Sequence, residues 1–224
     1  ILTAILLFSL PLWKGRISAD AAADTEKQEP LSLKKIIRIP GAKAVMVTFF
    51  CYCATEQTTG LWASSYLMLN RGLSEDAAAS FASLFFVGIT IGRALGGFLT
   101  LKLNDAQMIR LGQVLVAVGA LSLLIPFGVS GAMIGLILIG LGCAPIYPSI
   151  IHSTPERFGA DKSQAIIGVQ MASAYVGTCL MPPVFGVIAN HINVSLLPIY
   201  LLVILMIMVF MHEKLLKVTS KRHI

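Results

Sequence analysis

The sequence predicts an all-α membrane protein, and three observations support that prediction. Of its 224 residues, 56% are hydrophobic and only 12% are charged, whereas soluble domains carry about a quarter charged residues. The apolar residues gather in six runs of 17 to 25 residues, each long enough for a helix to cross a bilayer. The connections between the runs are short and polar. The lipid bilayer is therefore the expected surrounding, and the net charge of +6 is not interpreted as a nucleic-acid signal.

The chain begins in an apolar segment, residues 1–13, which we interpret as the end of a transmembrane helix. Its cations, Lys14 and Arg16, follow the apolar stretch, whereas a signal peptide carries them in front. The chain is therefore expected to be a fragment. Residues 14–42 form a polar linker with a short amphipathic surface helix at 31–39, or an unstructured tether in the first half. Residues 43–212 hold six spans and residues 213–224 form a tail. The spans lie near 45–69, 78–101, 108–127, 131–153, 165–189 and 195–211.

The distribution of cations predicts the orientation of the six spans. An even number of antiparallel spans places the linker, two of the loops and the tail on one side, with 15 Lys and Arg residues. The opposite loops hold only Arg71. Because cytoplasmic loops are enriched in Lys and Arg, the linker and the C-terminus are expected in the cytoplasm of a cell that carries this protein in its plasma or inner membrane.

Glu56 stands in the middle of the first span, where a carboxyl group costs roughly 2.5–3.5 kcal/mol to insert. At helical spacing it shares a stripe with Tyr52, Thr59, Ala63 and Tyr66. The stripe is expected to face the central cavity, with Trp62 at its edge. The alternative is a protonated acid that is hydrogen-bonded between helices.

Two more polar side chains lie inside the spans. Arg93, in the second span, stands at a depth similar to that of Glu56, so that it either pairs with Glu56 or snorkels toward the cytoplasm. Gln170, in the fifth span, shares a face with Ser173 and Gly177, and Tyr175 follows near mid-depth. A buried Gln either binds a ligand or joins two helices.

Glycine and proline predict close packing and a bend. Small-residue faces lie in the second span and in the fourth; they contain Gly88, Gly92, Gly96, Gly97, Gly131, Gly135, Gly140 and Gly142. Pro145 and Pro148 flank Tyr147 near the cytoplasmic end of the fourth span, where two missing N–H donors predict a kink that moves as a gate.

Three motifs resemble one group of transporters. They are Tyr52-x-x-x-Glu56-x-x-x-Gly60-x-Trp62-x-x-x-Tyr66-Leu67, then Phe85 to Arg93 followed by Gly96-Gly97, and Ala144-Pro-Ile-Tyr-Pro-Ser149 followed by Thr154-Pro-Glu-Arg-Phe-Gly159. Their order and spacing resemble the fucose-permease-like group of the major facilitator superfamily. The resemblance implies the six-helix C-terminal bundle of a twelve-helix fold. In the loop that ends with Lys102, this chain has Leu101 where the superfamily has an acid.

The resemblance also implies a function, namely secondary transport by alternating access with the substrate bound between two bundles. The partners are a small-molecule substrate and an N-terminal six-helix bundle of the same chain, and no cofactor is expected beyond a coupling proton. The substrate is a small polar solute, with sugars best known in the group. The expected substrate or coupling residues are Tyr52, Glu56, Thr59, Trp62, Arg93, Gln170 and Tyr175, and the expected gating residues are Lys102, Pro145, Tyr147 and Pro148.

Three other functions compete with this one. A drug or metabolite exporter of the same fold is disfavoured by the hydroxyl, acid and amide groups of the expected site. A solute sensor that binds without transport is compatible with the sequence. An enzyme would need paired acids, a His pair or a Ser/His dyad within the bilayer, and none is apparent. The four cysteines lie in apolar runs and are interpreted as buried side chains rather than a metal site.

Overall fold

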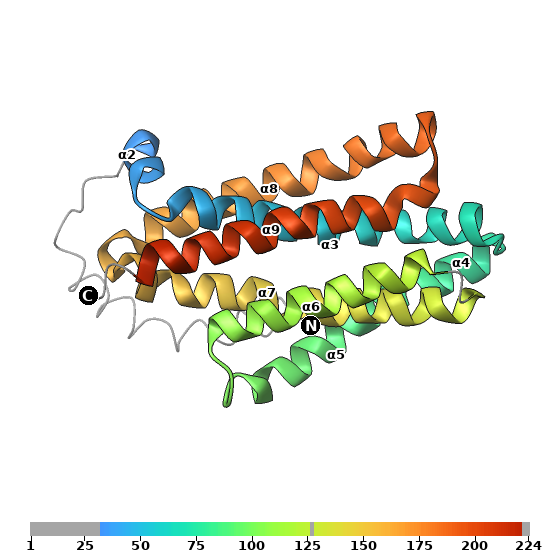
Figure 1. The fold of residues 1–224 in the computed structure, drawn as a ribbon, viewed down its shortest axis with the longest axis horizontal. Helices are drawn as coiled ribbons and strands as arrows, with labels where there is room; N and C mark the ends of the chain where they lie inside the picture. The colour runs from blue at the N-terminus through green and yellow to red at the C-terminus, as the bar shows by residue number, and fades with distance from the viewer. Residues whose placement is uncertain (1–31, 126–127, 221–224) are drawn as a thin grey trace, which may run out of the picture. The chain divides into compact units, whose positions relative to one another are not determined.

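The computed structural model describes residues 32–125 and 128–220, and these residues form helices without strands (Figure 1). The linker helix α2 spans Leu33–Arg38. The bundle consists of α3 (Ala42–Arg71), α4 (Glu75–Ala82), α5 (Leu84–Leu99), α6 (Asp105–Leu124), α7 (Gly128–Phe158), α8 (Ala160–His191), the 3-10 helix η1 (Val194–Leu196) and α9 (Leu197–Ser220). The expectations for residues 1–13 and for the first half of the linker lie outside the described residues.

The six predicted spans correspond to the long helices of this bundle. Five stretches in the described part of the chain are long and apolar enough to cross a membrane: Glu75–Leu99, Asp105–Leu124, Gly128–Phe158, Ala160–His191 and Val194–Ser220. The first span, α3, is long enough at 30 residues but is not among the five. Its middle carries the polar run Thr55-Glu-Gln-Thr-Thr59, and it is covered by α8 and α9 rather than standing alone.

The second span is interrupted at Ser83, where α4 ends and α5 begins. The hydroxyl of Ser83 donates to the carbonyl of Ser80 at 2.6 Å, and such local bonds compete with the helical ladder. The break allows α5 to take its own direction. In Figure 1 α5 lies at an angle to α6 and α7.

Glycines bring α7 into close contact with both α5 and α6, as the small-residue faces predicted. A Cβ on Gly92 would lie 2.6 Å from the Cβ of Ala144, and one on Gly119 would lie 2.6 Å from the carbonyl oxygen of Gly135. Gly88 faces Gly140 in the same way. Gly96 and Gly97, however, have no neighbour within 4 Å of a Cβ. The α5–α7 contact therefore ends after Gly92.

Helix α7 is continuous from Gly128 to Phe158, although Pro145, Pro148 and Pro155 lie inside it. Each proline lacks the N–H that would donate to the carbonyl four residues before it, so three bonds of the ladder are missing. In the first half of α7, one face is buried and Ile134 is exposed, whereas in the second half Tyr147, Pro148 and His152 are exposed. The kink expected at these prolines remains a prediction.

The two ends of the bundle differ in charge. One, here named the basic end, holds α2, the α5–α6 connection, the α7–α8 junction and the last turns of α9. At the opposite end, Arg71 Nη2 donates to the carbonyl of Leu123 at 2.7 Å and to that of Ile125 at 3.3 Å. The Tyr66 hydroxyl also donates to the Leu123 carbonyl, at 2.7 Å. These donors satisfy carbonyls that the end of α6 leaves without partners.

Candidate functional site

The acid in α3 is held by its own helix. The hydroxyl of Tyr52 donates to the carboxylate of Glu56, one turn further along. Tyr52 is buried, whereas Glu56 is half-buried, as are Cys53, Gln57 and Gly60 on the same helix. The carboxylate is therefore partly covered, and its remaining surface is open.

Aromatic rings connect this pair to α7 and α8. The ring of Tyr147 lies 5.1 Å from that of Phe49 and 6.2 Å from that of Tyr52, measured between centroids. The Tyr147 hydroxyl lies 3.6 Å from the sulfur of Met171 on α8. Tyr175 follows Met171 by one turn and is 68% exposed. We name Tyr52, Glu56, Tyr147 and Tyr175 the tyrosine–glutamate cluster.

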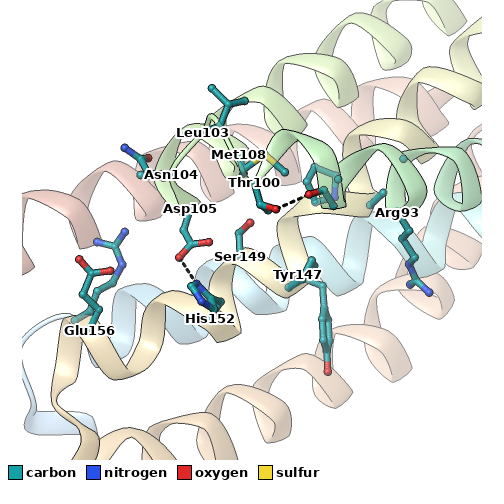
Figure 2. A pocket seen from close by; sticks show the side chains of 18 residues that line it. Arg93, Thr100, Leu103, Asn104, Asp105, Met108, Tyr147, Ser149, His152 and Glu156 are labelled. Carbon is teal, nitrogen blue, oxygen red and sulfur yellow. Dashed lines mark hydrogen bonds and ion pairs between the residues drawn. The ribbon is translucent and has the colours of Figure 1, made fainter.

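A cavity of about 1060 Å³ opens between α5, α6 and α7. Arg93 and Tyr147 line one part of it, and Asn104 and Glu156 line another. Figure 2 shows the side chains of Arg93 and Tyr147 extending toward the same side of the helices. Gly96 and Gly97 form part of the α5 wall, which is open because the α5–α7 contact ends after Gly92.

The basic-end part of the cavity holds a pair of ionisable side chains. Nδ1 of His152 lies 2.8 Å from Oδ2 of Asp105, and these side chains are 83% and 17% exposed. Asp105 is the first residue of α6, whose N-terminus is capped by Asn104 through a reciprocal bond with Gln107. The cap positions the carboxylate of Asp105 on the cavity wall (Figure 2).

The stripe predicted on α3 does not face the central cavity as a whole. Thr59, Ala63 and Tyr66 are each at most 1% exposed in this bundle, and the Thr59 hydroxyl donates to the carbonyl of Thr55 at 2.8 Å. Side chains that the six helices already cover cannot line a space beyond them. The prediction was wrong for these residues, and of the stripe only Glu56 reaches an open surface.

Trp62 and Gln170 join helices. Trp62 Nε1 donates to the carbonyl of Pro182 at 3.1 Å, and its ring packs edge-on against Phe185, so it lies against α8. Gln170 is fully buried and its Nε2 donates to the Thr154 hydroxyl at 3.0 Å. The second interpretation of Gln170, a bond between two helices, matches this geometry.

Arg93 does not pair with Glu56. The side-chain ion pairs among the described residues are Arg110–Glu213, His152–Asp105 and Lys162–Asp161. Arg93 is exposed on α5, and the carboxylate of Glu56 is engaged by Tyr52 instead. Among the expected gating residues, Lys102 is exposed beyond the end of α5, Pro145 is buried, and Tyr147 and Pro148 are exposed.

Ser149, Asp105 and His152 are cavity residues that the sequence analysis did not identify. A signal existed for two of them, because positions 149 and 152 are three residues apart and therefore share a helix face with Glu156. The contribution of Asp105 from another helix had no such signal.

Comparisons with known proteins agree on the family. Residues 45–223 match the Major Facilitator Superfamily. The chain is 24% identical over 159 residues to a di-/tripeptide transporter of Lactococcus lactis, covering 70% of this chain and 30% of the relative. It is 23% identical over 180 residues to Bypass of stop codon protein 6 of Saccharomyces cerevisiae, covering 74% and 35%. The chain thus spans about a third of the length of these relatives.

Solved structures show the same fold. A peptide transporter in complex with alafosfalin aligns with a TM-score of 0.67 at 21% identity, covering 78% of this chain and 39% of that one. The transporter FucP in its outward conformation also aligns with a TM-score of 0.67, at 18% identity, covering 84% and 47%. Each likeness covers less than half of the solved chain. With a family match over most of its length and several helices long and apolar enough to cross a membrane, the chain belongs to the Major Facilitator Superfamily and is a multi-pass membrane protein.

Proposed function

We propose that the protein carries a small polar solute across the membrane by proton-linked secondary transport. The observation that carries the proposal is the position of Tyr147. Its ring contacts Tyr52, whose hydroxyl holds Glu56, and its side chain also lines the cavity that contains Arg93. Tyr147 thus links the Tyr52–Glu56 pair to the cavity that contains Arg93, and together these groups can bind a solute rich in hydrogen-bonding groups.

The preferred solute is hydroxylated, with a sugar as the first candidate. A carboxylate accepts hydrogen bonds from sugar hydroxyls, and a phenol both accepts hydrogen bonds from them and donates to them. Glu56 is the candidate for the coupling proton, because it is the acid of the tyrosine–glutamate cluster and is partly desolvated. The structure is similar to that of an E. coli fucose:proton symporter, with a TM-score of 0.64 at 19% identity. This similarity supports the fold that the proposal assumes, and the identity of the solute is tested by the experiment below.

A short peptide is the second candidate, and one observation favours it. Glu56 and Arg93 carry opposite charges and do not pair with each other among the described residues. Neither charge has an ion-pair partner in the described part of the chain, so the two can bind the ammonium and the carboxylate of a zwitterion, although Glu56 also accepts a hydrogen bond from Tyr52. The sequence similarity to a di-/tripeptide transporter points the same way. The alternatives are an exporter of the same fold and a sensor that does not transport, and the uptake experiment below also tests them.

The proposed orientation follows the charge of the two ends. The basic end, with the linker, Lys102 and the C-terminus, lies in the cytoplasm, and the end that holds Arg71 lies outside. The membrane is the plasma or inner membrane of the cell. The open side of the tyrosine–glutamate cluster faces an N-terminal six-helix bundle of the same chain.

Uptake by the reconstituted full-length protein tests the function. Proteoliposomes are supplied with labelled L-fucose or labelled alanyl-alanine, with and without an inward proton gradient. Accumulation of one solute that depends on the gradient is expected. Uptake that the gradient does not change would contradict proton coupling, and binding without uptake would identify a sensor.

A further inference from the structure

Two serines of α7 differ although both are buried. Ser149 and Ser153 are each 3% exposed and stand one turn apart. The hydroxyl of Ser153 donates to the carbonyl of Ile150 at 3.2 Å. Ser149 instead lines the cavity, and Figure 2 shows its hydroxyl directed into the space beside Thr100 and Asp105. The hydroxyl forms no hydrogen bond to another described residue, and because it faces the cavity it is open to water or to a ligand.

The wall around Ser149 offers both acceptors and donors. Asp105 uses Oδ2 for His152, so that Oδ1 keeps its capacity to accept. The Thr100 hydroxyl donates to the carbonyl of Gly97 at 2.9 Å and can still accept a bond. This wall suits a solute group that both donates and accepts hydrogen bonds, and a hydroxyl is the simplest such group. The charge of Asp105 has its partner in His152, so the solute need not be a cation.

The position of these residues separates them from the tyrosine–glutamate cluster. Arg93 and Tyr147 border the cavity nearer the cluster, whereas Ser149, Asp105 and His152 line it toward the basic end. The cavity is continuous between them and has a volume of about 1060 Å³, which is the size of a small-molecule site. A solute that leaves the cluster can therefore enter this second part without crossing a helix.

We propose that Ser149, Asp105 and Thr100 form a second binding station for a hydroxylated solute, between the tyrosine–glutamate cluster and the basic end. The proposal rests on the proposed transport function. His152 positions the carboxylate of Asp105 and does not contact the solute. The station holds solute hydroxyls on the way between the cluster and the surface of the basic end.

Protection of an introduced thiol tests the station directly. Ala106 lines the cavity next to Asp105, so Ala106→Cys in the full-length protein places a thiol beside the station. Its rate of labelling by N-ethylmaleimide is measured by mass spectrometry. Because this method distinguishes the label at each position, the native cysteines need not be replaced. L-fucose is the probe, and alanyl-alanine is run in parallel. L-fucose is expected to slow labelling. Adding Ser149→Ala should raise the L-fucose concentration that gives half-maximal protection by roughly threefold to tenfold, as expected for the loss of one hydrogen bond.

Matched variants separate this station from the first site. Ser153→Ala removes a serine of equal burial that bonds to its own helix, and protection should be unchanged. Glu56→Gln should lower uptake but leave intact the protection of the thiol introduced by Ala106→Cys. If L-fucose still protects the thiol but the protein takes up no solute, the transport function is overturned and the station is not. Equal protection in the Ser149→Ala and Ser153→Ala variants, protection by alanyl-alanine alone, or no protection by either solute would overturn the station.

Discussion

Tyr52 and Glu56 form a pair within one helix, in which a buried phenol donates to a half-buried carboxylate one turn away. The pair explains how an acid is accommodated in the middle of a predicted span, because a hydrogen bond offsets part of the cost of removing the carboxyl group from water. The phenol also links the acid to Tyr147 through ring contact.

The first prediction concerns the proton. Replacing Glu56 by Gln keeps the size of the side chain and removes the titratable group. Glu56→Gln should stop accumulation driven by a proton gradient and spare exchange of the solute between two sides at equal pH. Counterflow and gradient-driven uptake in proteoliposomes measure the two activities. Glu75→Gln, at an exposed acid that begins α4, is the control, and gradient-driven uptake equal to that of the parent would contradict the assignment.

The second prediction concerns Arg93, which is exposed and unpaired among the described residues. If it contacts the solute, Arg93→Ala should reduce uptake at least about tenfold, since a charged hydrogen bond is worth roughly 1.5–3 kcal/mol. Arg93→Lys should keep part of the activity because the charge remains while the fork of donors is lost. Initial uptake rates at several solute concentrations provide the measurement. Full activity of Arg93→Ala would leave only an anchoring role at the membrane surface.

The third prediction compares two glycines on α5. A Cβ on Gly92 meets the Cβ of Ala144 at 2.6 Å, whereas Gly96 has open space. Gly92→Leu should therefore destabilise the bundle by about 1–3 kcal/mol, which is the usual cost of overpacking. Gly96→Leu should leave the thermal unfolding midpoint in detergent near that of the parent. Equal midpoints for the two variants would show that α5 and α7 are not in contact at Gly92.

The fourth prediction compares two arginines that bond differently. Arg71 donates to two carbonyls at the end of α6, whereas Arg110 forms an ion pair with Glu213 in which the side chains are 52% and 37% exposed. Exposed ion pairs contribute little to stability, and hydrogen bonds from a charged donor that cap the end of a helix contribute more. Arg71→Met should lower the unfolding midpoint in detergent more than Arg110→Met does. A larger effect at Arg110 would contradict the capping role of Arg71.

The fifth prediction concerns orientation. Lys102 and Ser74 are exposed at opposite ends of the bundle. In intact cells, an impermeant maleimide should label Ser74→Cys and should label Lys102→Cys only after the membrane is opened. The measurement is the amount of label at each position, with the parent protein as the background. Labelling of Lys102→Cys alone in intact cells would invert the proposed topology.

Several features of the fold follow from the sequence because they depend on local properties. The length of the apolar runs sets the length of the helices, and the spacing of Gly88 and Gly92 places small residues on one face of a helix. The structure confirms that this face packs against Gly140 and Ala144 of α7. Three prolines in α7 and the polar middle of α3 are likewise visible in the sequence, but whether α7 bends is not.

The sequence by itself determined a membrane-embedded bundle of six spans, the embedded acid at Glu56 and the family to which the chain belongs. Only the tertiary structure decided which polar side chains remain exposed and which are covered by a neighbouring helix. Helical periodicity tells which side chains share a face, whereas the neighbouring helix decides whether that face is covered. α8 covers Trp62, and α7 and α8 join through Gln170. The divergence of α5 from α7 after Gly92 leaves Arg93, Ser149 and Asp105 around a cavity, because contacts between distant segments depend on packing that no local pattern encodes.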